Sequence, residues 1–357
     1  MKNWSYLLII IGMSMCSRPA VEGLLSYTDP SSGRRKPVRT LQEWNFKRVE
    51  LLDSVQALTG VLPPRSGLPL FDVQYIDSVC ETAYTRYTVR FTVAEGEILP
   101  VLLYVPVREC TRRKCPAMLA LHPTGALGKQ ITDGDDEYKL PYGKELAERG
   151  YVVIAPDYPG FGELSDFDFL NSRYASGSMK GIFDHIRCID LLQSLDFVDA
   201  DKIGVIGHSL GGHNALFVAA FDTRLKVVVT SCGWTEFEYY NIGEEASKFY
   251  GGRLGPWAQD KYMPLLRDQY QLERVPFNFH EIIALIAPRA VYSFSPLHDV
   301  NFDVEGVKTG IEKAAEAYRF LDAEHLLRIS YPDAKHDFPE PYRMEAYRWT
   351  DSLFLNK

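Results

Sequence analysis

The sequence predicts an α/β fold with a mostly parallel central sheet and helices on both of its faces. From Ala117 onward, short apolar runs rich in β-branched residues alternate with segments of helical spacing. Such runs are typical of strands buried on both faces, and their alternation with helices is typical of a parallel sheet. The expected strands are 118–121, 151–155, 203–206, 225–230, 290–294 and 326–331.

Residues 1–20 have the pattern of a secretory signal peptide. A basic residue precedes the apolar stretch 6–11, and small and polar residues follow it. The stretch is too short to span a bilayer, which takes ~20 consecutive apolar residues. Cleavage after Cys16 or Ala20 would release the protein into the periplasm or the medium, whereas an acylated Cys16 would anchor it as a lipoprotein. We expect release, because Met15 fits the lipoprotein pattern poorly.

Residues 40–357 are expected to form one domain that follows a linker. The linker, 29–39, is rich in Pro, Ser, Gly and Arg. Helical apolar spacing then predicts a helix over 41–59 that ends at a glycine. Alternating runs at 84–93 and 98–105 predict antiparallel strands at an edge of the sheet.

Composition and charge narrow the class of partner. The chain has 357 residues, of which 46% are hydrophobic and 24% charged, as in an ordinary globular protein with a sizeable core. Its net charge of −8 argues against nucleic acid or an anionic membrane surface as a partner. A neutral or modestly charged small substrate is therefore favoured.

The cysteines suggest a disulfide and no metal site. Cys110 and Cys115 flank a short basic turn, and in an exported chain they either form a disulfide or remain free. Cys188 and Cys232 lie in apolar surroundings, so we expect them to be small buried side chains. No Cys or His pair has ligand spacing near a third ligand, and we expect neither a metal nor another cofactor.

The pentapeptide Gly207-His208-Ser209-Leu210-Gly211 lies between the strand at 203–206 and an apolar helix of small residues. In such a tight turn, side chains at the two glycine positions would collide with neighbouring backbone, and the serine is held strained with its hydroxyl exposed. Glycines at both positions around a serine occur by chance in about one in ten chains of this length. The position between strand and helix nevertheless predicts that Ser209 is a nucleophile.

Groups that could stabilise an oxyanion are expected nearby, since functional side chains gather at the carboxyl ends of parallel strands. His122-Pro123-Thr124-Gly125 follows the strand at 118–121. Pro123 has no N–H, so we expect Thr124, or failing that Gly125, to donate to the oxyanion together with Leu210 at the helix N-terminus. The alternative is that this loop is an ordinary strand-end turn.

The base and the acid are expected in the loops after the last two strands. His336 follows the strand at 326–331, and Asp299 follows the strand at 290–294. The order Ser209, Asp299, His336 is the one typical of a Ser-Asp-His set on such a sheet. Asp303 lies in the same loop as Asp299 but further from the strand end, so we expect Asp299 to be the acid.

A long excursion, 234–285, is inserted after the strand at 225–230 and is rich in Trp, Tyr and Phe. Insertions at this end of a sheet commonly cover the nucleophile, and aromatic faces suit sugar rings. Most of these aromatic residues are expected to pack the core of the insertion itself. Trp234 is the exception, because it lies just past the strand end, and we expect it to contact substrate.

These residues resemble the α/β-hydrolases, above all the dienelactone-hydrolase-like and acetyl-xylan-esterase-like exported serine esterases of bacteria. The resemblance spans roughly 40–350. The tight turn at Ser209, known as the nucleophile elbow, carries part of this resemblance. The other stretches that carry it are 121–124 with Gly128-Lys129, 145–151, 155–163, 287–290 and 336–339.

The resemblance implies hydrolysis of a carboxylic ester, such as an acylated carbohydrate or another small ester, through a Ser-His-Asp set. Dienelactone hydrolases use Cys as the nucleophile, so Ser209 counts against dienelactone as the substrate. A serine peptidase of the same fold stays open as an alternative, although such relatives usually carry an additional propeller domain. A binding protein that lost catalysis is a further alternative, which the presence of Ser209, Asp299 and His336 argues against.

Overall fold

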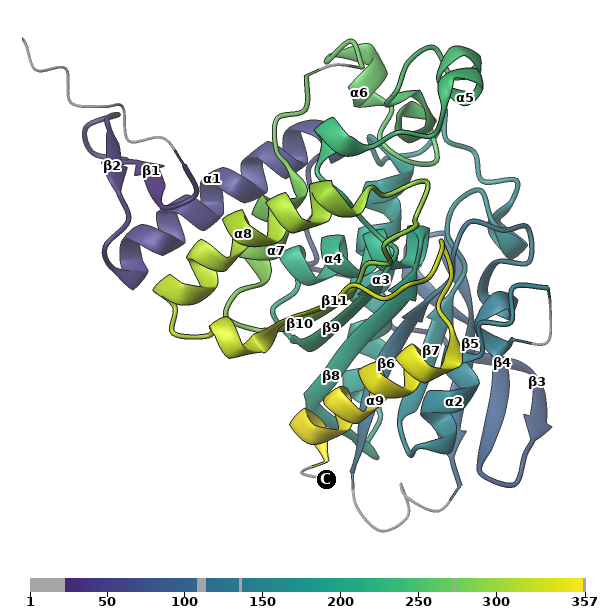
Figure 1. The fold of residues 1–357 in the computed structure, drawn as a ribbon. Coiled ribbons are helices and arrows are strands. Elements are labelled where there is room, and N and C mark those ends of the chain that lie inside the picture. Colours follow the sequence, from purple (N-terminus) through teal and green to yellow (C-terminus); the bar gives the residue numbers. More distant parts are fainter. Residues whose placement is uncertain (1–22, 108–113, 135–136, 273, 356–357) are drawn as a thin grey trace, which may run out of the picture.

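A nine-stranded sheet forms the centre of the part of the chain that the structure describes (Figure 1). The structure is a computed structural model, and it describes residues 23–107, 114–134, 137–272 and 274–355. The strands lie in the order β11, β10, β9, β8, β6, β7, β5, β4, β3. Their bounds are β3 Gln74–Cys80, β4 Tyr84–Ala94, β5 Glu97–Pro106, β6 Cys115–Leu121, β7 Val152–Pro156, β8 Val198–His208, β9 Leu225–Ser231, β10 Ala290–Phe294 and β11 Leu327–Ser330.

The strands from β11 to β7 run parallel to one another, and β5, β4 and β3 extend the sheet in antiparallel fashion. The prediction of a mostly parallel sheet with antiparallel strands at one edge is therefore confirmed. At the carboxyl end of β8, Gly207 pairs with Leu121 of β6, and His208 pairs with Ser231 of β9. The residue that follows β8 therefore lies between the ends of two neighbouring strands.

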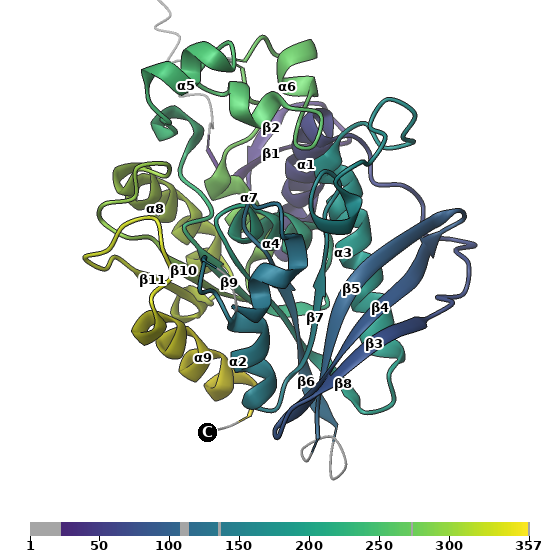
Figure 2. The ribbon, with the colours of Figure 1, turned by 90° about the vertical axis from the view of Figure 1, so that its right-hand side faces the viewer.

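Each face of the sheet has its own hydrophobic core and its own helices (Figure 2). One face is covered by α3, α4, α7 and α8, and α1 packs outside α7. The other face is covered by α2 and α9. The bounds are α1 Leu41–Thr59, α2 Tyr142–Glu148, α3 Gly177–Ser194, α4 Leu210–Phe221, α7 Phe279–Ile286, α8 Val304–Phe320 and α9 Glu340–Phe354.

The segment expected as a linker, 29–39, contains part of a β-hairpin. Strands β1 (Ser26–Thr28) and β2 (Arg35–Pro37) pair in antiparallel fashion. In the turn between them, the Asp29 carboxylate accepts hydrogen bonds from the backbone N–H and the hydroxyl of Ser31. An Asp side chain that accepts a hydrogen bond from the backbone N–H two residues later stabilises a turn. The composition of 29–39 predicted a linker and did not indicate the hairpin.

Several short helices lie above the carboxyl ends of the strands (Figure 1). They belong to the excursion expected at 234–285. The last part of that excursion does not lie above the strands but forms a helix of the layer that covers the sheet. Helix α7 packs on α4 in the layer that covers the sheet, and a capping box at Asn278 begins it. The short helices are η4 Phe237–Tyr239, α5 Glu244–Phe249, η5 Gly255–Ala258 and α6 Leu265–Asp268, and elsewhere η2 Gly128–Asp133, η3 Gly162–Leu164 and η6 Glu324–Leu326.

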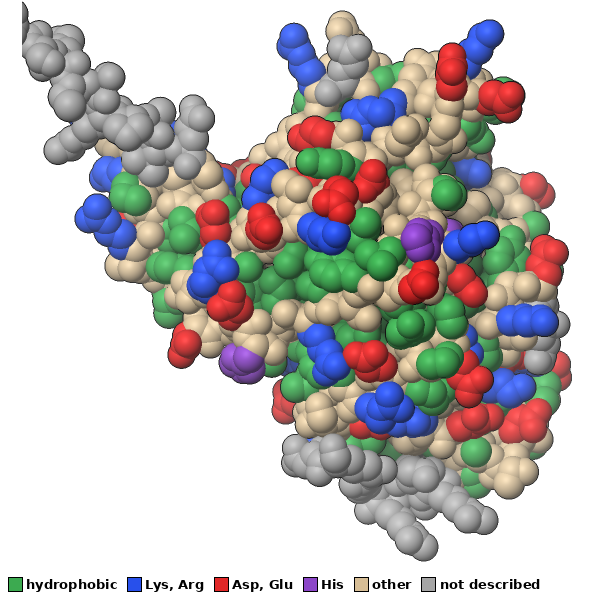
Figure 3. Space-filling view, in the orientation of Figure 1, with side chains coloured by type: hydrophobic (Ala, Val, Ile, Leu, Met, Phe, Trp, Pro, Cys, Tyr) green, Lys and Arg blue, Asp and Glu red, His purple; other side chains and the backbone are tan. Residues whose placement is uncertain are grey.

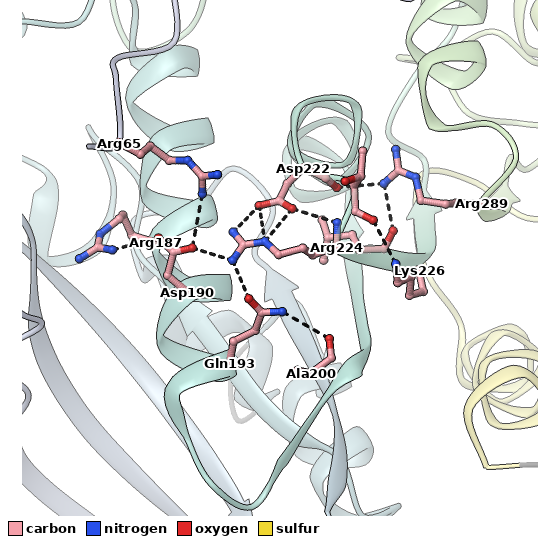
Figure 4. A network of polar contacts seen from close by, with 11 residues as sticks. Arg65, Arg187, Asp190, Gln193, Ala200, Asp222, Arg224, Lys226 and Arg289 are labelled. Atoms are coloured by element: carbon pink, nitrogen blue, oxygen red, sulfur yellow. Dashed lines mark hydrogen bonds and ion pairs between the residues drawn. The ribbon is translucent and has the colours of Figure 1, made fainter. Parts of the chain in front are cut away.

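A polar network ties the helices to the sheet beyond the C-terminus of α4, far from the carboxyl ends of the strands (Figure 4). The Arg289 guanidinium donates to the carbonyl oxygens of Ala219 and Asp222, where α4 ends, at 2.6 and 2.9 Å. Arg224 pairs with Asp222 and with Asp190 of α3. A cation at a helix C-terminus neutralises its unpaired carbonyl groups. The network therefore fixes α3 and α4 relative to β9 and β10.

The molecular surface mixes both signs of charge. On the face shown in Figure 3, Lys and Arg side chains are interspersed with Asp and Glu, and apolar side chains gather in a band between α8 and α9. None of the helices within the described ranges combines the length and the apolar character that a membrane crossing requires.

The structure tests some of the predictions made for the cysteines. Cys115 is disulfide-bonded. Cys110 lies outside the described residues, as do Cys16 and the whole predicted leader, so the pairing of Cys110 with Cys115 stays a prediction. Cys188 and Cys232 are buried free thiols, as expected.

Apart from His208 beside Ser209, three histidines of the described residues are buried without an opposite charge beside them. Burial lowers the pKa of His122, His185 and His213 to about 3 in each case. His213 stacks between Phe217 and Trp257, and within the described chain neither of its ring nitrogens has a hydrogen-bond partner. At acidic pH the imidazole is protonated in the unfolded chain and must release its proton when the protein folds.

We predict that His213→Phe weakens the acid sensitivity of the fold. Between pH 6.5 and 3 the unfolded chain binds a proton at His213 that the native state does not, so the unfolding free energy falls as the pH falls. The variant should remove roughly 1.4 kcal/mol per pH unit from that slope, measured by urea unfolding between pH 5.5 and 4.5. The exposed His325 is the control, since His325→Gln should leave the slope unchanged. Equal slopes for the wild type and His213→Phe would contradict the prediction.

Candidate active site

Ser209 lies in the sharp turn between β8 and α4, in a strained conformation. Its φ is 53° and its ψ is −120°, outside the regions that L-residues favour, and such strain costs about 1–3 kcal/mol. The Ser209 N–H donates to the Ser231 carbonyl of β9 at 2.8 Å, and its own carbonyl accepts from His213 N–H. These backbone bonds hold the turn from both sides.

The two glycines of the turn are required by close backbone contacts. A Cβ on Gly207 would overlap the backbone of Gly211, and a Cβ on Gly211 would overlap the carbonyl oxygen of Leu121 in β6. The expected reason for glycine at these positions is therefore observed in the geometry. The contacts place the N-terminus of α4 directly against the end of β6.

Ser209, His336 and Asp299 form one hydrogen-bonded chain. The Ser209 Oγ lies 2.9 Å from His336 Nε2, and His336 Nδ1 lies 2.9 and 3.0 Å from the two carboxylate oxygens of Asp299. Because Nδ1 faces a carboxylate, it carries the proton, and Nε2 is then free to accept from the serine hydroxyl. The structure thus brings together the three side chains that the sequence order singled out.

Asp299 is held in place by its own loop, and Asp303 has a different role. One oxygen of Asp299 accepts from the backbone N–H groups of Asn301 and Phe302 at 2.8 and 3.1 Å. Its side chain is 1% exposed. Asp303 instead caps the N-terminus of α8, where its carboxylate accepts from Glu305 N–H at 2.8 Å. The contact with His336 is therefore made by Asp299.

The His336 ring lies between two other rings. Phe302 stacks on it with centroids 5.8 Å apart, and His208 lies 5.1 Å away. His208 Nδ1 lies 3.0 Å from the hydroxyl of Ser231. Burial lowers the pKa of His208 well below its ordinary value, so this neighbour stays neutral and does not oppose a positive charge on His336.

The Cys232 thiol is a polar neighbour of the acid that sequence reasoning assigned to packing alone. Cys232 has a φ of 48°, and its Sγ lies 3.4 Å from the carbonyl of Asp337. Burial and the negative charge of Asp299, to which the thiol is also hydrogen-bonded, raise its pKa well above the ordinary value. Ligand-type atoms of Cys232, Asp299 and His336 lie within 4.8 Å of one another, but hydrogen bonds already engage them.

The expected oxyanion groups lie beside Ser209. Leu210 is the first residue of α4, so its N–H has no partner four residues earlier within the helix. Thr124 lines the same cavity as Ser209 and Leu210. Two hydrogen bonds fix the start of the loop that carries Thr124. The Tyr142 hydroxyl donates to the Leu121 carbonyl at 2.5 Å, and the Tyr158 hydroxyl donates to the His122 carbonyl at 2.9 Å.

A cavity of about 230 Å³ opens next to Ser209 and Thr124. Most of its lining comes from the segments around α5 and η5, which therefore lie over Ser209. Asn301 and Phe302 close it on the side of the acid loop. The residues contributed by the covering segments are Tyr240, Ile242, Tyr250, Pro256, Trp257, Gln259, Lys261 and Tyr262.

The expectation that Trp234 contacts substrate requires correction. Its indole is 1% exposed, packs near Phe279 of α7 and donates to the hydroxyl of Ser293 in β10 at 3.0 Å. It does not line the cavity beside Ser209. Proximity to a strand end fixes the position of the Trp234 backbone, but its side chain turns down into the helical layer.

Trp257 and Lys261 are lining residues that sequence reasoning did not single out. Trp257 was one of many aromatic residues in the excursion, and nothing in the pattern distinguished it. Lys261 is a lone basic residue in a polar stretch, and such residues are most often solvated. Only the fold of the segment shows that both face the cavity.

Comparisons with known proteins place the chain among hydrolases by sequence and by fold. A model of the prolyl oligopeptidase family matches residues 143–281, which include Ser209. The Bacillus subtilis protein YtaP, named as a hydrolase, is 30% identical over 252 residues, covering 67% of this chain and 79% of YtaP.

Solved structures with the same fold include glucuronoyl esterases. One from Solibacter usitatus has a TM-score of 0.70 and 19% identity, and covers 93% of this chain and 97% of its own. Another, from Caldicellulosiruptor kristjansonii, has a TM-score of 0.67 and 22% identity. The match covers 94% of this chain and 90% of the esterase chain. With its sheet, its elbow and its relationship to YtaP, the chain belongs to the α/β-hydrolase superfamily.

Proposed function

We propose that the protein is a serine hydrolase that cleaves carboxylic esters through an acyl-enzyme. The observation that carries the proposal is the hydrogen-bonded chain from Ser209 through His336 to Asp299, at the mouth of a cavity lined by aromatic residues. In this mechanism the chain of contacts activates a hydroxyl that is otherwise a weak nucleophile.

His336 Nε2 takes the proton of Ser209 as its oxygen attacks the ester carbonyl, and then gives that proton to the leaving alcohol. Asp299 holds the imidazole in the required tautomer and stabilises the imidazolium that forms. The N–H groups of Leu210 and Thr124 donate to the oxyanion. Water then enters the site and releases the acid by the same two proton transfers.

The lining of the cavity favours a carbohydrate ester or another small ester as substrate. Aromatic faces such as those of Trp257 and Tyr262 suit the apolar faces of sugar rings, and the amides of Gln259 and Asn301 can bond hydroxyl groups. The solved structures of the same fold include enzymes named as glucuronoyl esterases, which supports this class of substrate. Export by the leader at 1–20 stays a prediction.

A serine peptidase of the same fold is the second candidate. The match of residues 143–281 to the prolyl oligopeptidase family favours it. A fluorophosphonate probe should label Ser209 under either proposal, and turnover then separates the two. Short-chain aryl esters and acetylated sugars should be hydrolysed if the protein is an esterase, whereas labelling with turnover of peptide amides alone would favour the peptidase.

We predict that Ser209→Ala lowers esterase activity by something like ~10⁶-fold and leaves the fold intact, because the nucleophile and its base act as a unit. His336→Ala should cost about as much, and the double variant should cost little more than either. The measurements are kcat/KM on an aryl acetate and the far-UV circular dichroism spectrum. Activity of Ser209→Ala within tenfold of the wild type would exclude Ser209, and additive losses would separate His336 from it.

We predict that Asp299→Asn lowers kcat by up to ~10⁴-fold, since the amide no longer fixes the tautomer of His336. Asp303→Asn is the matched control in the same loop. It should change kcat by less than a few-fold and slightly destabilise α8, because it removes a negative charge from the N-terminus of that helix. The comparison uses steady-state kinetics together with thermal unfolding of both variants. A large loss of kcat in Asp303→Asn and a small one in Asp299→Asn would reverse the assignment of the acid.

A further inference from the structure

Lys261 is the charged residue of the cavity beside Ser209. Among the described residues that line this cavity, every other side chain is apolar, aromatic, a hydroxyl or an amide. The protein as a whole carries a net charge of −8, so a cation at this position is opposite to the overall charge. Burial raises the pKa values of the cavity phenols Tyr240 and Tyr262, so neither supplies a compensating negative charge at neutral pH.

The backbone on both sides of Lys261 is fixed to the N-terminus of α3. Gly177 N–H donates to the Asp260 carbonyl, and Ser178 N–H donates to the Tyr262 carbonyl, each at 3.0 Å. The stem of Lys261 also packs against the chain, since a Cβ on Gly160 would lie 3.3 Å from the Lys261 Cβ. The start of this side chain is therefore positioned before any ligand arrives.

The ammonium group is held by aromatic rings and not by an acid. Lys261 Nζ lies 5.0 Å from the ring centroid of Phe161 and 5.4 Å from that of Tyr262. Asp260, its neighbour in sequence, pairs with Arg267 instead. Across the ranges that the structure describes, no ion pair engages Lys261, so its charge is available to a ligand. Ring faces orient an ammonium group but leave its N–H donors free for an anionic oxygen.

We propose that Lys261 makes this cavity a site for esters that also carry a carboxylate, whose oxygens the ammonium group binds. The inference rests on the proposed ester hydrolysis and adds a substrate class to it. A carboxylate on either the acyl or the alcohol part would give a charge-assisted hydrogen bond inside a partly desolvated cavity. Esters without the charge would bind through the aromatic rings alone.

Two pairs of esters test the proposal, and each pair differs in a single carboxylate. On the acyl side the pair is 4-nitrophenyl hemiglutarate and 4-nitrophenyl pentanoate. On the alcohol side it is 4-acetoxybenzoate and its methyl ester. The quantity compared between enzymes is the ratio of kcat/KM for the charged ester to that for the neutral ester, after subtraction of the uncatalysed rate. Intrinsic differences in ester reactivity cancel in this comparison.

In at least one pair, Lys261→Met should lower this ratio about tenfold, the loss expected for one charge-assisted hydrogen bond. Lys261→Arg should retain most of the ratio, and Lys261→Glu should lower it further than Lys261→Met. Lys202→Met is the matched control, since it removes a partly exposed charge from β8 well before Ser209. It should leave both ratios unchanged.

A purely structural role for Lys261 would lower kcat/KM equally for the charged and the neutral ester, and that result would overturn the proposal.

A binding measurement tests the same idea without turnover. In the Ser209→Ala background, 4-hydroxybenzoate should bind more tightly than methyl 4-hydroxybenzoate by calorimetry, with an advantage that salt and Lys261→Met both reduce. Equal binding of the two, together with charged-to-neutral ratios that Lys261→Met leaves unchanged in both ester pairs, would overturn the proposal. Failure of the wild type to hydrolyse any of the four esters would count against ester hydrolysis, and the calorimetry would still decide the role of Lys261.

Discussion

The close approach of three backbone segments around Ser209 is the constraint on which the rest of the site depends. The end of β8, the start of α4 and the end of β6 meet so tightly that neither Gly207 nor Gly211 has room for a side chain. This contact forces the positive φ of Ser209 and directs the first N–H groups of α4 at the same point as the hydroxyl. The cost of the strain is small beside the burial of the surrounding sheet and helices, whose packing therefore maintains it.

Around this fixed point, the other groups of the site come from loops that are anchored by hydrogen bonds of their own. The Asp299 carboxylate is oriented by two backbone N–H groups before it meets His336, and the Cys232 thiol bonds it as well. The loop of Thr124 is held by the hydroxyl groups of Tyr142 and Tyr158. Such bonds remove the conformational freedom that loops otherwise have, so the site is organised before substrate arrives.

Some of the stretches that carry the family resemblance serve the structure and not the chemistry. Lys129 and Asp157 form a buried ion pair at 2.5 Å, and Lys129 also reaches Glu163 at 2.5 Å. A Cβ on Gly128 or on Gly162 would overlap the Asp157 carboxylate. The glycines, the lysine and the acids therefore form one packed unit that joins two loops, in which Lys129 and Asp157 are buried and Glu163 is exposed. Loss of one partner would leave an uncompensated buried charge, which costs more than the pair contributes.

By itself, the sequence determined the strands of the parallel part, the tight turn at Ser209 and the two loops that would face it, because period, glycine placement and chain order are properties of the sequence alone. The tertiary structure decided which side chains meet. It brought Asp299 to His336, assigned Asp303 to the cap of α8, buried Trp234 against Ser293 and turned Lys261 towards the cavity. The direction of a loop side chain depends on contacts with residues far away in the chain, and no local pattern encodes those contacts.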